Sequence, residues 1–188
     1  ESQIHRELAS GLSMPVGFKN GTGGQIDVAI DAIRCAGHAH WFPSLTKEGT
    51  PAILQSKGNP HSYLILRGGR ESGPNYDAQS VRAAAAALAA AELPASLLVD
   101  CSHGNSGKDP ARQALVMSAL CEQIEQQQHA IRGVMLESHL QAGSQPLRAG
   151  QPLTYGQSIT DACLSLEQTA PLLELLAAAV RRCRQSRG

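Results

Sequence analysis

Aromatic side chains and an excess of charge of either sign are both lacking in this sequence. Phe, Trp and Tyr make up 3% of the 188 residues, and 16 basic side chains balance 16 acidic ones. Zero formal net charge argues against a protein that wraps nucleic acid, because such proteins carry a basic patch or stripe. We see no signal peptide and no apolar run long enough to span a bilayer. We therefore expect a cytoplasmic protein without nucleic-acid or membrane partners.

The cysteine and glycine patterns also lack familiar signatures. The cysteine count is odd and no C-x-x-C pair occurs, which favours reduced thiols over disulfides; the residues are Cys35, Cys101, Cys121, Cys163 and Cys183. The glycine-rich segment 21–24 (GTGG) does not have the G-x-G-x-x-G spacing of a dinucleotide-binding turn, and no acidic partner for a ribose is evident.

The apolar residues are mainly Ala, Leu, Val and Ile, arranged as short strands that alternate with helices. Strands that are apolar on both faces and separated by helices predict an α/β fold with a parallel sheet. We count about four βα units, with a β-hairpin at 40–55 inserted between them, and treat 1–188 as a single domain. The expected strands are 15–19, 63–67, 97–101 and 131–136, and the expected helices are 2–12, 25–36, 78–92, 110–127 and 160–183.

An ionisable residue follows or ends each expected strand. The four are Lys19, Arg67, His103 (in the run Asp100–Asn105) and Glu137. The carboxyl ends of parallel strands share one edge of a sheet, and that edge carries the active site in α/β proteins. One such residue would be unremarkable, but four in four strands predict a site.

Lys19 and Arg67 are cations beside glycine-rich turns. Glycine allows backbone N–H groups to approach an anion, and arginine binds phosphate or carboxylate with two parallel hydrogen bonds. We expect the two cations to flank a phosphate-sized pocket for a small anionic substrate. The alternative is ordinary surface charge at strand ends, which is common in loops.

His103, Glu137 and Asp161 offer one nitrogen and two carboxylate donors, a set that suits Mn²⁺, Fe²⁺, Co²⁺ or Zn²⁺. If they bind one metal ion, their donor atoms should lie within about 5 Å of one another. Their wide spacing forms no compact motif, so other roles stay open. His103 could hydrogen-bond within its loop, Glu137 could form a salt bridge, and Asp161 could cap the last helix.

Two further residues compete for a place among the ligands. His139 lies two residues after Glu137, and strand alternation sends both to the same side. Cys101 lies two residues before His103, so a Cys-x-His ligand pair is conceivable. A small buried cysteine in the core is the commoner role for such a residue.

Several strings resemble one family closely. ESQIHRELASGLSMPVGFKNGT, LILRGG, VDCSHGNS, GVMLESHL and PLTYGQSITDAC resemble the class I 3-deoxy-D-arabino-heptulosonate-7-phosphate (DAHP) synthases. This resemblance implies a (β/α)8 barrel, of TIM type, that condenses phosphoenolpyruvate with erythrose 4-phosphate and releases phosphate. It also implies one divalent metal ion and a homo-oligomer. The strings match the C-terminal half of such a barrel, and the start at Glu1 looks internal.

The resemblance implies a role for each strand-end residue. Lys19 and Arg67 correspond to residues that bind phosphoenolpyruvate. His103 corresponds to a metal ligand beside that substrate and is, with Lys19, expected to be catalytic. Glu137 and Asp161 correspond to two further ligands, which favours Glu137 over His139.

The family's remaining cysteine ligand, its Lys-Pro-Arg-Thr segment for erythrose 4-phosphate and another phosphate-binding arginine have no counterpart here. The isolated chain is therefore expected to be inactive. The alternatives are a non-catalytic fragment, or a related barrel enzyme that condenses phosphoenolpyruvate with another sugar phosphate. The KNGT and ITDAC strings argue against the related enzyme. Ser13, Phe42 and Ser44 fall near the family's pocket for an aromatic amino acid effector, whose identity the sequence does not reveal.

Overall fold

The computed structural model describes residues 2–186, so Glu1, where the resemblance begins, lies outside the described residues. Its centre is a four-stranded sheet in the order β1-β4-β5-β6, in which every neighbouring pair is parallel. The α/β fold with a parallel sheet is thus confirmed, and each strand lies within a residue or two of its predicted bounds. The strands are β1 (Val16–Lys19), β4 (Ser62–Leu66), β5 (Leu97–Asp100) and β6 (Ile131–Met135).

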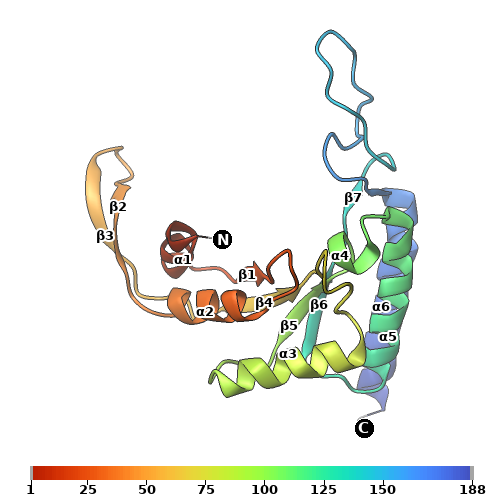
Figure 1. Cartoon of the computed structure of the whole chain (residues 1–188), viewed down its shortest axis with the longest axis horizontal. Helices are drawn as coiled ribbons and strands as arrows, with labels where there is room; N and C mark the ends of the chain where they lie inside the picture. The colour runs from red at the N-terminus through yellow and green to blue at the C-terminus, as the bar shows by residue number, and fades with distance from the viewer. Residues whose placement is uncertain (1, 187–188) are drawn as a thin grey trace.

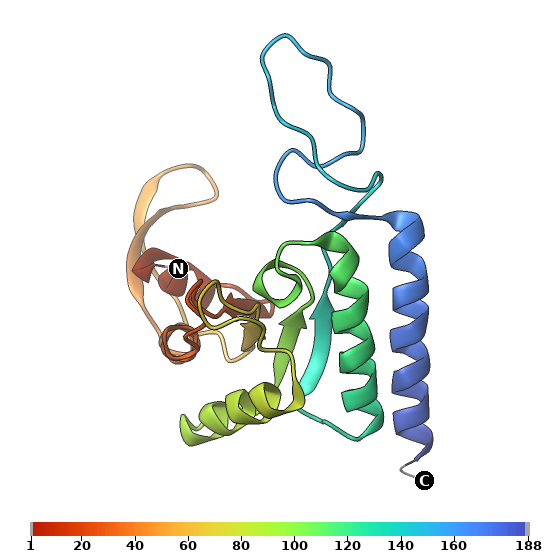
Figure 2. The ribbon, with the colours of Figure 1, turned by 45° about the vertical axis from the view of Figure 1, so that its right-hand side comes forward.

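Helices follow the strands along the chain, as the alternating pattern predicted. Figure 1 shows α2 and α3 beneath the sheet, and Figure 2 shows α5 and α6 side by side next to β6. A short helix at the end of β5 and a 3-10 turn before α5 were not predicted. The helices are α1 (Gln3–Ser10), α2 (Asp27–Ala36), α3 (Ala78–Ala90), α4 (His103–Ser106), η1 (Pro110–Arg112), α5 (Gln113–Glu125) and α6 (Leu166–Gln185).

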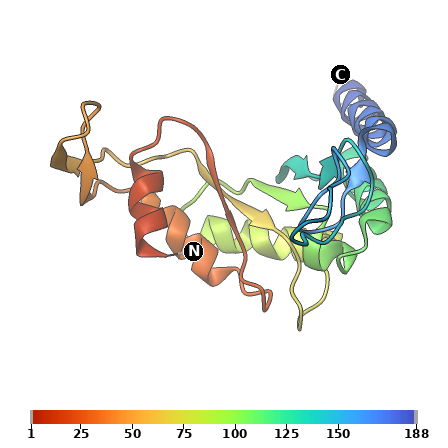
Figure 3. The same ribbon diagram turned by 90° about the horizontal axis from the view of Figure 1, so that it is seen from above.

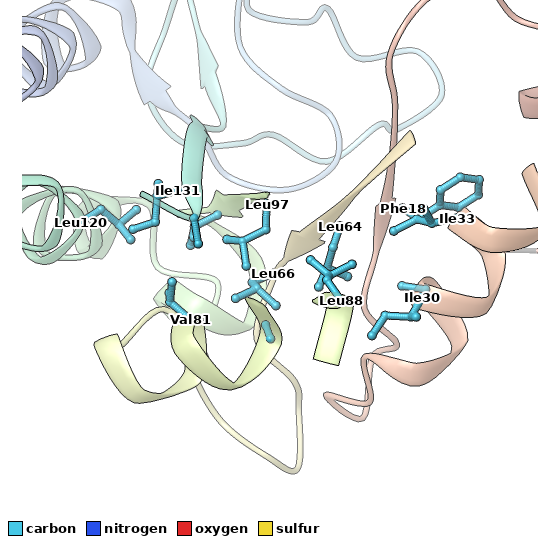
Figure 4. Packing of buried hydrophobic residues seen from close by; sticks show 14 of the residues in the cluster. Phe18, Ile30, Ile33, Leu64, Leu66, Val81, Leu88, Leu97, Leu120 and Ile131 are labelled. Carbon is cyan, nitrogen blue, oxygen red and sulfur yellow. The ribbon is translucent and has the colours of Figure 1, made fainter. Parts of the chain in front are cut away.

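The core lies between the sheet and the helices (Figure 4). Alternate strand residues such as Leu64 and Leu66 point toward the helices and are at most 1% exposed. Val81 and Leu88 of α3 belong to the same cluster and face these strand residues. Full burial of each such side chain contributes about 1.5–3 kcal/mol, so this layer is a main source of stability for the fold.

β1 and β6 form the two edges of the sheet within the described residues, so the sheet is open. Figure 3, seen from above, shows the strands and helices spread along one long curve, with α1 and the hairpin toward one end and α6 toward the other. The predicted hairpin is confirmed. It consists of β2 (Trp41–Leu45) and β3 (Pro51–Gln55), which pair antiparallel.

The prediction for the last helix was wrong at its beginning. The helix α6 begins at Leu166, because Ser165 is its N-cap and its side chain accepts a hydrogen bond from the N–H of Gln168. The preceding residues form a long loop that leaves and rejoins the sheet region through a small parallel pair, β7 (Ser138–His139) and β8 (Leu164–Ser165). This loop projects away from the sheet in Figure 1. Between residues 2 and 186, no helix has both the length and the apolar character needed to cross a membrane.

Candidate metal and substrate site

Three asparagines tie together the loops at the carboxyl edge of the sheet. The Asn20 side chain accepts a hydrogen bond from the backbone N–H of Arg67 (2.7 Å) and donates one to the carbonyl of Gly68 (3.1 Å). The Asn105 side chain accepts one from the N–H of Asn75 (2.8 Å). Buried backbone groups require partners, so these amides fix the loops that follow β1, β4 and β5 relative to one another.

Gly68 and Gly104 bring two of those loops into direct contact. Gly68 has φ +68°, and a Cβ there would lie 2.5 Å from the carbonyl carbon of Gly104. A Cβ on Gly104 would lie 2.7 Å from the carbonyl carbon of Gly68. Only glycine allows this approach without a shift of the backbone. The contact holds Arg67 and His103, the neighbours of these glycines, on adjacent loops.

His103 begins α4 in a left-handed backbone conformation, with φ +51°. Such a conformation costs about 1–3 kcal/mol for a non-glycine residue and persists where the surroundings hold it. Here its ring nitrogen Nδ1 lies 2.9 Å from Oδ2 of Asp100 and 2.7 Å from Oγ of Ser102. These two contacts to Nδ1 fix the orientation of the imidazole ring. Its other nitrogen, Nε2, faces away from Asp100.

Three side chains, those of His103, Glu137 and Asp161, come together at the carboxyl ends of the strands. Nε2 of His103 lies 3.4 Å from Oε1 of Glu137 and 3.8 Å from Oδ2 of Asp161. One donor atom from each residue falls within 4.8 Å of the other two, and the three could hold a metal ion. A nitrogen and two carboxylate oxygens suit the divalent transition metals named from the sequence. The donor geometry thus matches the expected spacing, and the ligand role stays a prediction.

The position of Glu137 is fixed by Gln113 of α5. The Gln113 side chain donates to the carbonyl of Glu137 (3.1 Å) and accepts from its N–H (2.8 Å). Burial raises the pKa of the Glu137 carboxyl, and the negative charges of Asp161 and Asp100 raise it further, although His103 opposes the shift. A divalent cation between these groups would relieve the repulsion between the carboxylates.

Asp161 lies in the long loop before β8 and does not cap the last helix, so that alternative is wrong. Its Oδ1 accepts a hydrogen bond from Nζ of Lys108 (3.4 Å), while Oδ2 faces His103. The side chains of Asp161 and Lys108 are 44% and 65% exposed, so solvent weakens this ion pair. The contact nevertheless joins the C-terminal end of the long loop to the segment that follows α4.

The structure separates the two rival ligands from this cluster. The Nδ1 atom of His139 accepts a hydrogen bond from the N–H of Leu140, and His139 is exposed. Cys101 is fully buried in the core, and burial raises the pKa of its thiol to about 12. A thiol must lose its proton to bind a metal, so Cys101 fits the role of a small core residue.

A cavity of about 700 Å³ opens beside His103. Arg67 and His103 line it, and so do the glycines of the loops after β1 and β4. Lys19 is not among its lining residues, so the two cations do not line the same cavity, and the substrate-binding role of each stays a prediction. The ammonium of Lys19 instead lies 2.7 Å from Oδ2 of Asp100. Further basic residues at the cavity are Arg70, Lys108 and Arg112.

Residues 1–174 match the family described as DAHP synthetase I. The chain belongs to the DAHP synthetase I family. The phospho-2-dehydro-3-deoxyheptonate aldolase of Schizosaccharomyces pombe named tyrosine-inhibited is 53% identical over 99% of this chain. The Escherichia coli aldolase named Phe-sensitive is 54% identical over 96% of it. A solved aldolase structure from Francisella tularensis covers 97% of the chain with a TM-score of 0.92 and 49% identity.

These DAHP synthetase relatives are longer than the present chain. The chain spans 51% of the length of the two curated relatives and 53% of the Francisella protein. The resemblance inferred from the sequence motifs is therefore confirmed, and so is the correspondence of the chain to about half of such proteins.

The residues that position the site were not predicted from the sequence. Asp100 lay in the strand-end run but received no role, although it is fully buried and contacts both Lys19 and His103. Asn20 and Asn105 lie inside the KNGT and SHGNS strings that carry the resemblance. The available signal was a polar side chain at the end of an apolar strand, because a buried polar group at such a position requires a hydrogen-bond partner.

Proposed function

We propose that the chain is the metal-binding half of a DAHP synthase, a transferase that condenses phosphoenolpyruvate with erythrose 4-phosphate to give DAHP and phosphate. This reaction is the first step of the shikimate pathway to aromatic amino acids. The observation that carries the proposal is the convergence of His103, Glu137 and Asp161 beside the cavity lined by Arg67. Family membership over residues 1–174 supports the same activity.

The individual roles follow from charge and position. Arg67 binds the phosphate or carboxylate of phosphoenolpyruvate, since its guanidinium forms paired hydrogen bonds with either group. Lys19, whose ammonium donates a hydrogen bond to Asp100, binds the same substrate as Arg67 and is catalytic together with His103. His103, Glu137 and Asp161 hold a divalent cation, Mn²⁺, Fe²⁺, Co²⁺ or Zn²⁺. Such a bound cation polarises an aldehyde carbonyl as a Lewis acid. The side chains at the carboxyl ends of the strands hold phosphoenolpyruvate in reacting geometry.

The open sheet supports the proposal that the chain forms half of a barrel. In a (β/α)8 barrel every strand has two neighbours, whereas β1 and β6 each have one within the described residues. We propose that β1, β4, β5 and β6 are four consecutive strands of such a barrel, with the hairpin β2–β3 inserted. The coverage of about half of each relative supports this number. A cytoplasmic homo-oligomer is the assembly that we propose.

The metal ligands are tested by paired histidine substitutions in the full-length protein. His103→Ala should abolish formation of DAHP from the two substrates with Mn²⁺ present, and should weaken Mn²⁺ binding. His139→Ala is the matched control, because His139 lies nearby but outside the donor cluster. Retained activity and unweakened Mn²⁺ binding in His103→Ala would refute the proposed site. Treatment with a chelator should also remove activity, and added Mn²⁺ should restore it.

An aromatic amino acid effector is a second part of the proposal. A cavity of about 670 Å³ lies between α1 and the hairpin, and Ser13, Phe42 and Ser44 all line it. Relatives are named tyrosine-inhibited, Phe-sensitive and Trp-sensitive. We expect one of these three amino acids to inhibit the full-length protein. Ser44→Trp should fill the cavity and abolish inhibition while activity persists, and inhibition that survives this change would contradict the assignment.

A further inference from the structure

Asp100 is the most deeply buried charged residue near the candidate site. It ends β5 with no exposed surface. Its Oδ2 accepts hydrogen bonds from Nζ of Lys19 (2.7 Å) and from Nδ1 of His103 (2.9 Å). Its Oδ1 accepts from the N–H of Ser102 (2.9 Å) and from the Ser102 hydroxyl. Four donors thus satisfy one carboxylate, which is the condition under which a buried charge is tolerated.

These contacts determine where the proton of His103 lies. The ammonium of Lys19 and the N–H of Ser102 can only donate, so they favour the ionised form of Asp100, which can only accept. The ring atom Nδ1 lies 2.9 Å from Oδ2 and 2.7 Å from Oγ of Ser102. Because the Ser102 hydroxyl donates its hydrogen to Oδ1, Nδ1 carries the hydrogen of the contact with Oδ2. In the neutral imidazole, Nε2 is then left with a free electron pair, and Nε2 is the atom that faces Glu137 and Asp161.

We propose that Asp100 is a positioning residue that fixes the metal-binding tautomer of His103 and links that histidine to Lys19 through a shared carboxylate oxygen. This inference rests on the proposed metal site and deepens it. Histidines that bind metals commonly donate their other N–H to a carboxylate, which orients the ring and increases its basicity. The additional feature here is that the same oxygen also holds the ammonium of Lys19.

The contact between Lys19 and Asp100 spans three strands of the sheet. Lys19 is on β1 and Asp100 is on β5, so the lysine side chain reaches across β4, the strand between them, to make its contact. The Lys19 side chain is 33% exposed, whereas Asp100 is not exposed at all. An anionic substrate that draws the ammonium toward itself would therefore change the hydrogen bonding of His103 without touching it.

The first experiment needs no substitution. Nitrogen-15 NMR of the metal-free, full-length protein, at a pH high enough for a neutral ring, distinguishes a protonated from an unprotonated ring nitrogen. The signals of His103 are assigned by their loss in His103→Ala. We expect Nδ1 of His103 to be protonated and Nε2 to be unprotonated. The opposite tautomer, or an equal mixture of the two, would overturn the inference whatever the variants do.

The second experiment measures Mn²⁺ binding by the decrease in the electron paramagnetic resonance signal of free Mn²⁺. Asp100→Asn, which has the same shape but a single acceptor oxygen, should weaken binding about 10–100-fold, the usual effect of losing such a partner. Asp77→Asn is the control, because Asp77 caps α3 and asparagine caps a helix equally well. An unchanged affinity in Asp100→Asn would overturn the inference.

The two possible failures can be told apart. If His103→Ala binds Mn²⁺ as tightly as the unaltered protein, the proposed metal site itself is wrong, and the role of Asp100 falls with it. If His103→Ala loses binding but Asp100→Asn does not, the metal site stands and only the positioning role is lost. Should Asp100→Asn not fold, the nitrogen-15 measurement on the unaltered protein still decides.

The link to Lys19 is tested separately by double substitution. Lys19→Met should shift the nitrogen-15 resonances of His103, because it removes a donor from the shared oxygen. The same change made in Asp100→Asn should shift them much less, since the link is already weakened. Equal shifts in both backgrounds would show that Lys19 and His103 are not coupled through Asp100.

Discussion

Gly68 and Gly104 lie backbone against backbone where the loops after β4 and β5 meet. Gly68→Ala should destabilise the protein in two ways, because its φ is +68° and its new Cβ would lie 2.5 Å from Gly104. Gly73→Ala is a matched control, since Gly73 has φ +76° with nothing within 4 Å of the added Cβ.

Urea unfolding separates the two costs. Gly73→Ala should lose about 1–2 kcal/mol of unfolding free energy, the cost of a left-handed alanine. Gly68→Ala should lose a further 1–3 kcal/mol or so from overpacking. Equal losses in the two variants would mean that the loops separate easily and that the contact does not constrain the site.

Arg67→Ala should raise the Michaelis constant for phosphoenolpyruvate and lower turnover in the full-length protein. The guanidinium lines the cavity beside His103, and its Nε is buried without a hydrogen-bond partner among residues 2–186. A bound anion would supply that partner. Arg148→Ala, which alters an exposed arginine of the long loop, serves as control. Steady-state kinetics that leave both constants unchanged in Arg67→Ala would exclude the substrate-binding role.

The 188-residue chain alone should show no measurable DAHP synthase activity. The edges of its sheet at β1 and β6 are unpaired within the described residues, and the chain spans about half of each relative. Loss of substrate positioning can remove about 7–11 kcal/mol of barrier lowering. The assay compares the chain with a chimera in which it replaces the matching half of the Escherichia coli Phe-sensitive relative. Turnover by the chain within about tenfold of the chimera would contradict the half-barrel proposal.

The N-cap of α3 should stabilise the protein in a pH-dependent manner. Burial raises the pKa of Asp77, but hydrogen bonds from Ser80 and Gln79 outweigh it, so the pKa is lowered below its usual value. A lowered folded-state pKa means that the stabilisation is present above the unfolded-state pKa, about 3.9, and is lost as pH falls through the folded-state value. Asp77→Ala should cost about 1 kcal/mol at neutral pH. In urea unfolding, that difference should shrink at acid pH, and a difference independent of pH would contradict the prediction.

The sheet was predictable because each strand is a short apolar run bounded by turn residues. The segment YLILR predicted β4, and the apolar stripe of residues 25–36 predicted α2. The last helix was misplaced because Ser158, Thr160 and Asp161 resemble an N-terminal cap. Ser165 provides the actual cap, and a choice between two plausible caps depends on how the preceding loop packs, which local sequence does not encode.

The sequence predicted which residues belong to the candidate site better than it predicted how they contact one another. Strand ends identified Lys19, Arg67, His103 and Glu137, because parallel strands deliver their carboxyl ends to one edge. Spacing could not choose between Glu137 and His139, and the resemblance made that choice. The role of Asp100 depends on contacts to residues far away in the sequence, so it became visible only when the strands were placed side by side.

The burial of Cys101 makes this thiol a reporter of how often the sheet opens. With no exposed surface and a pKa raised to about 12, it should not react with a thiol reagent while β5 stays in place. Cys35 and Cys163 are half-buried and should be labelled sooner. The slow labelling phase of Cys101, followed by mass spectrometry with and without substrates, would therefore measure the opening rate of the strand that carries Asp100.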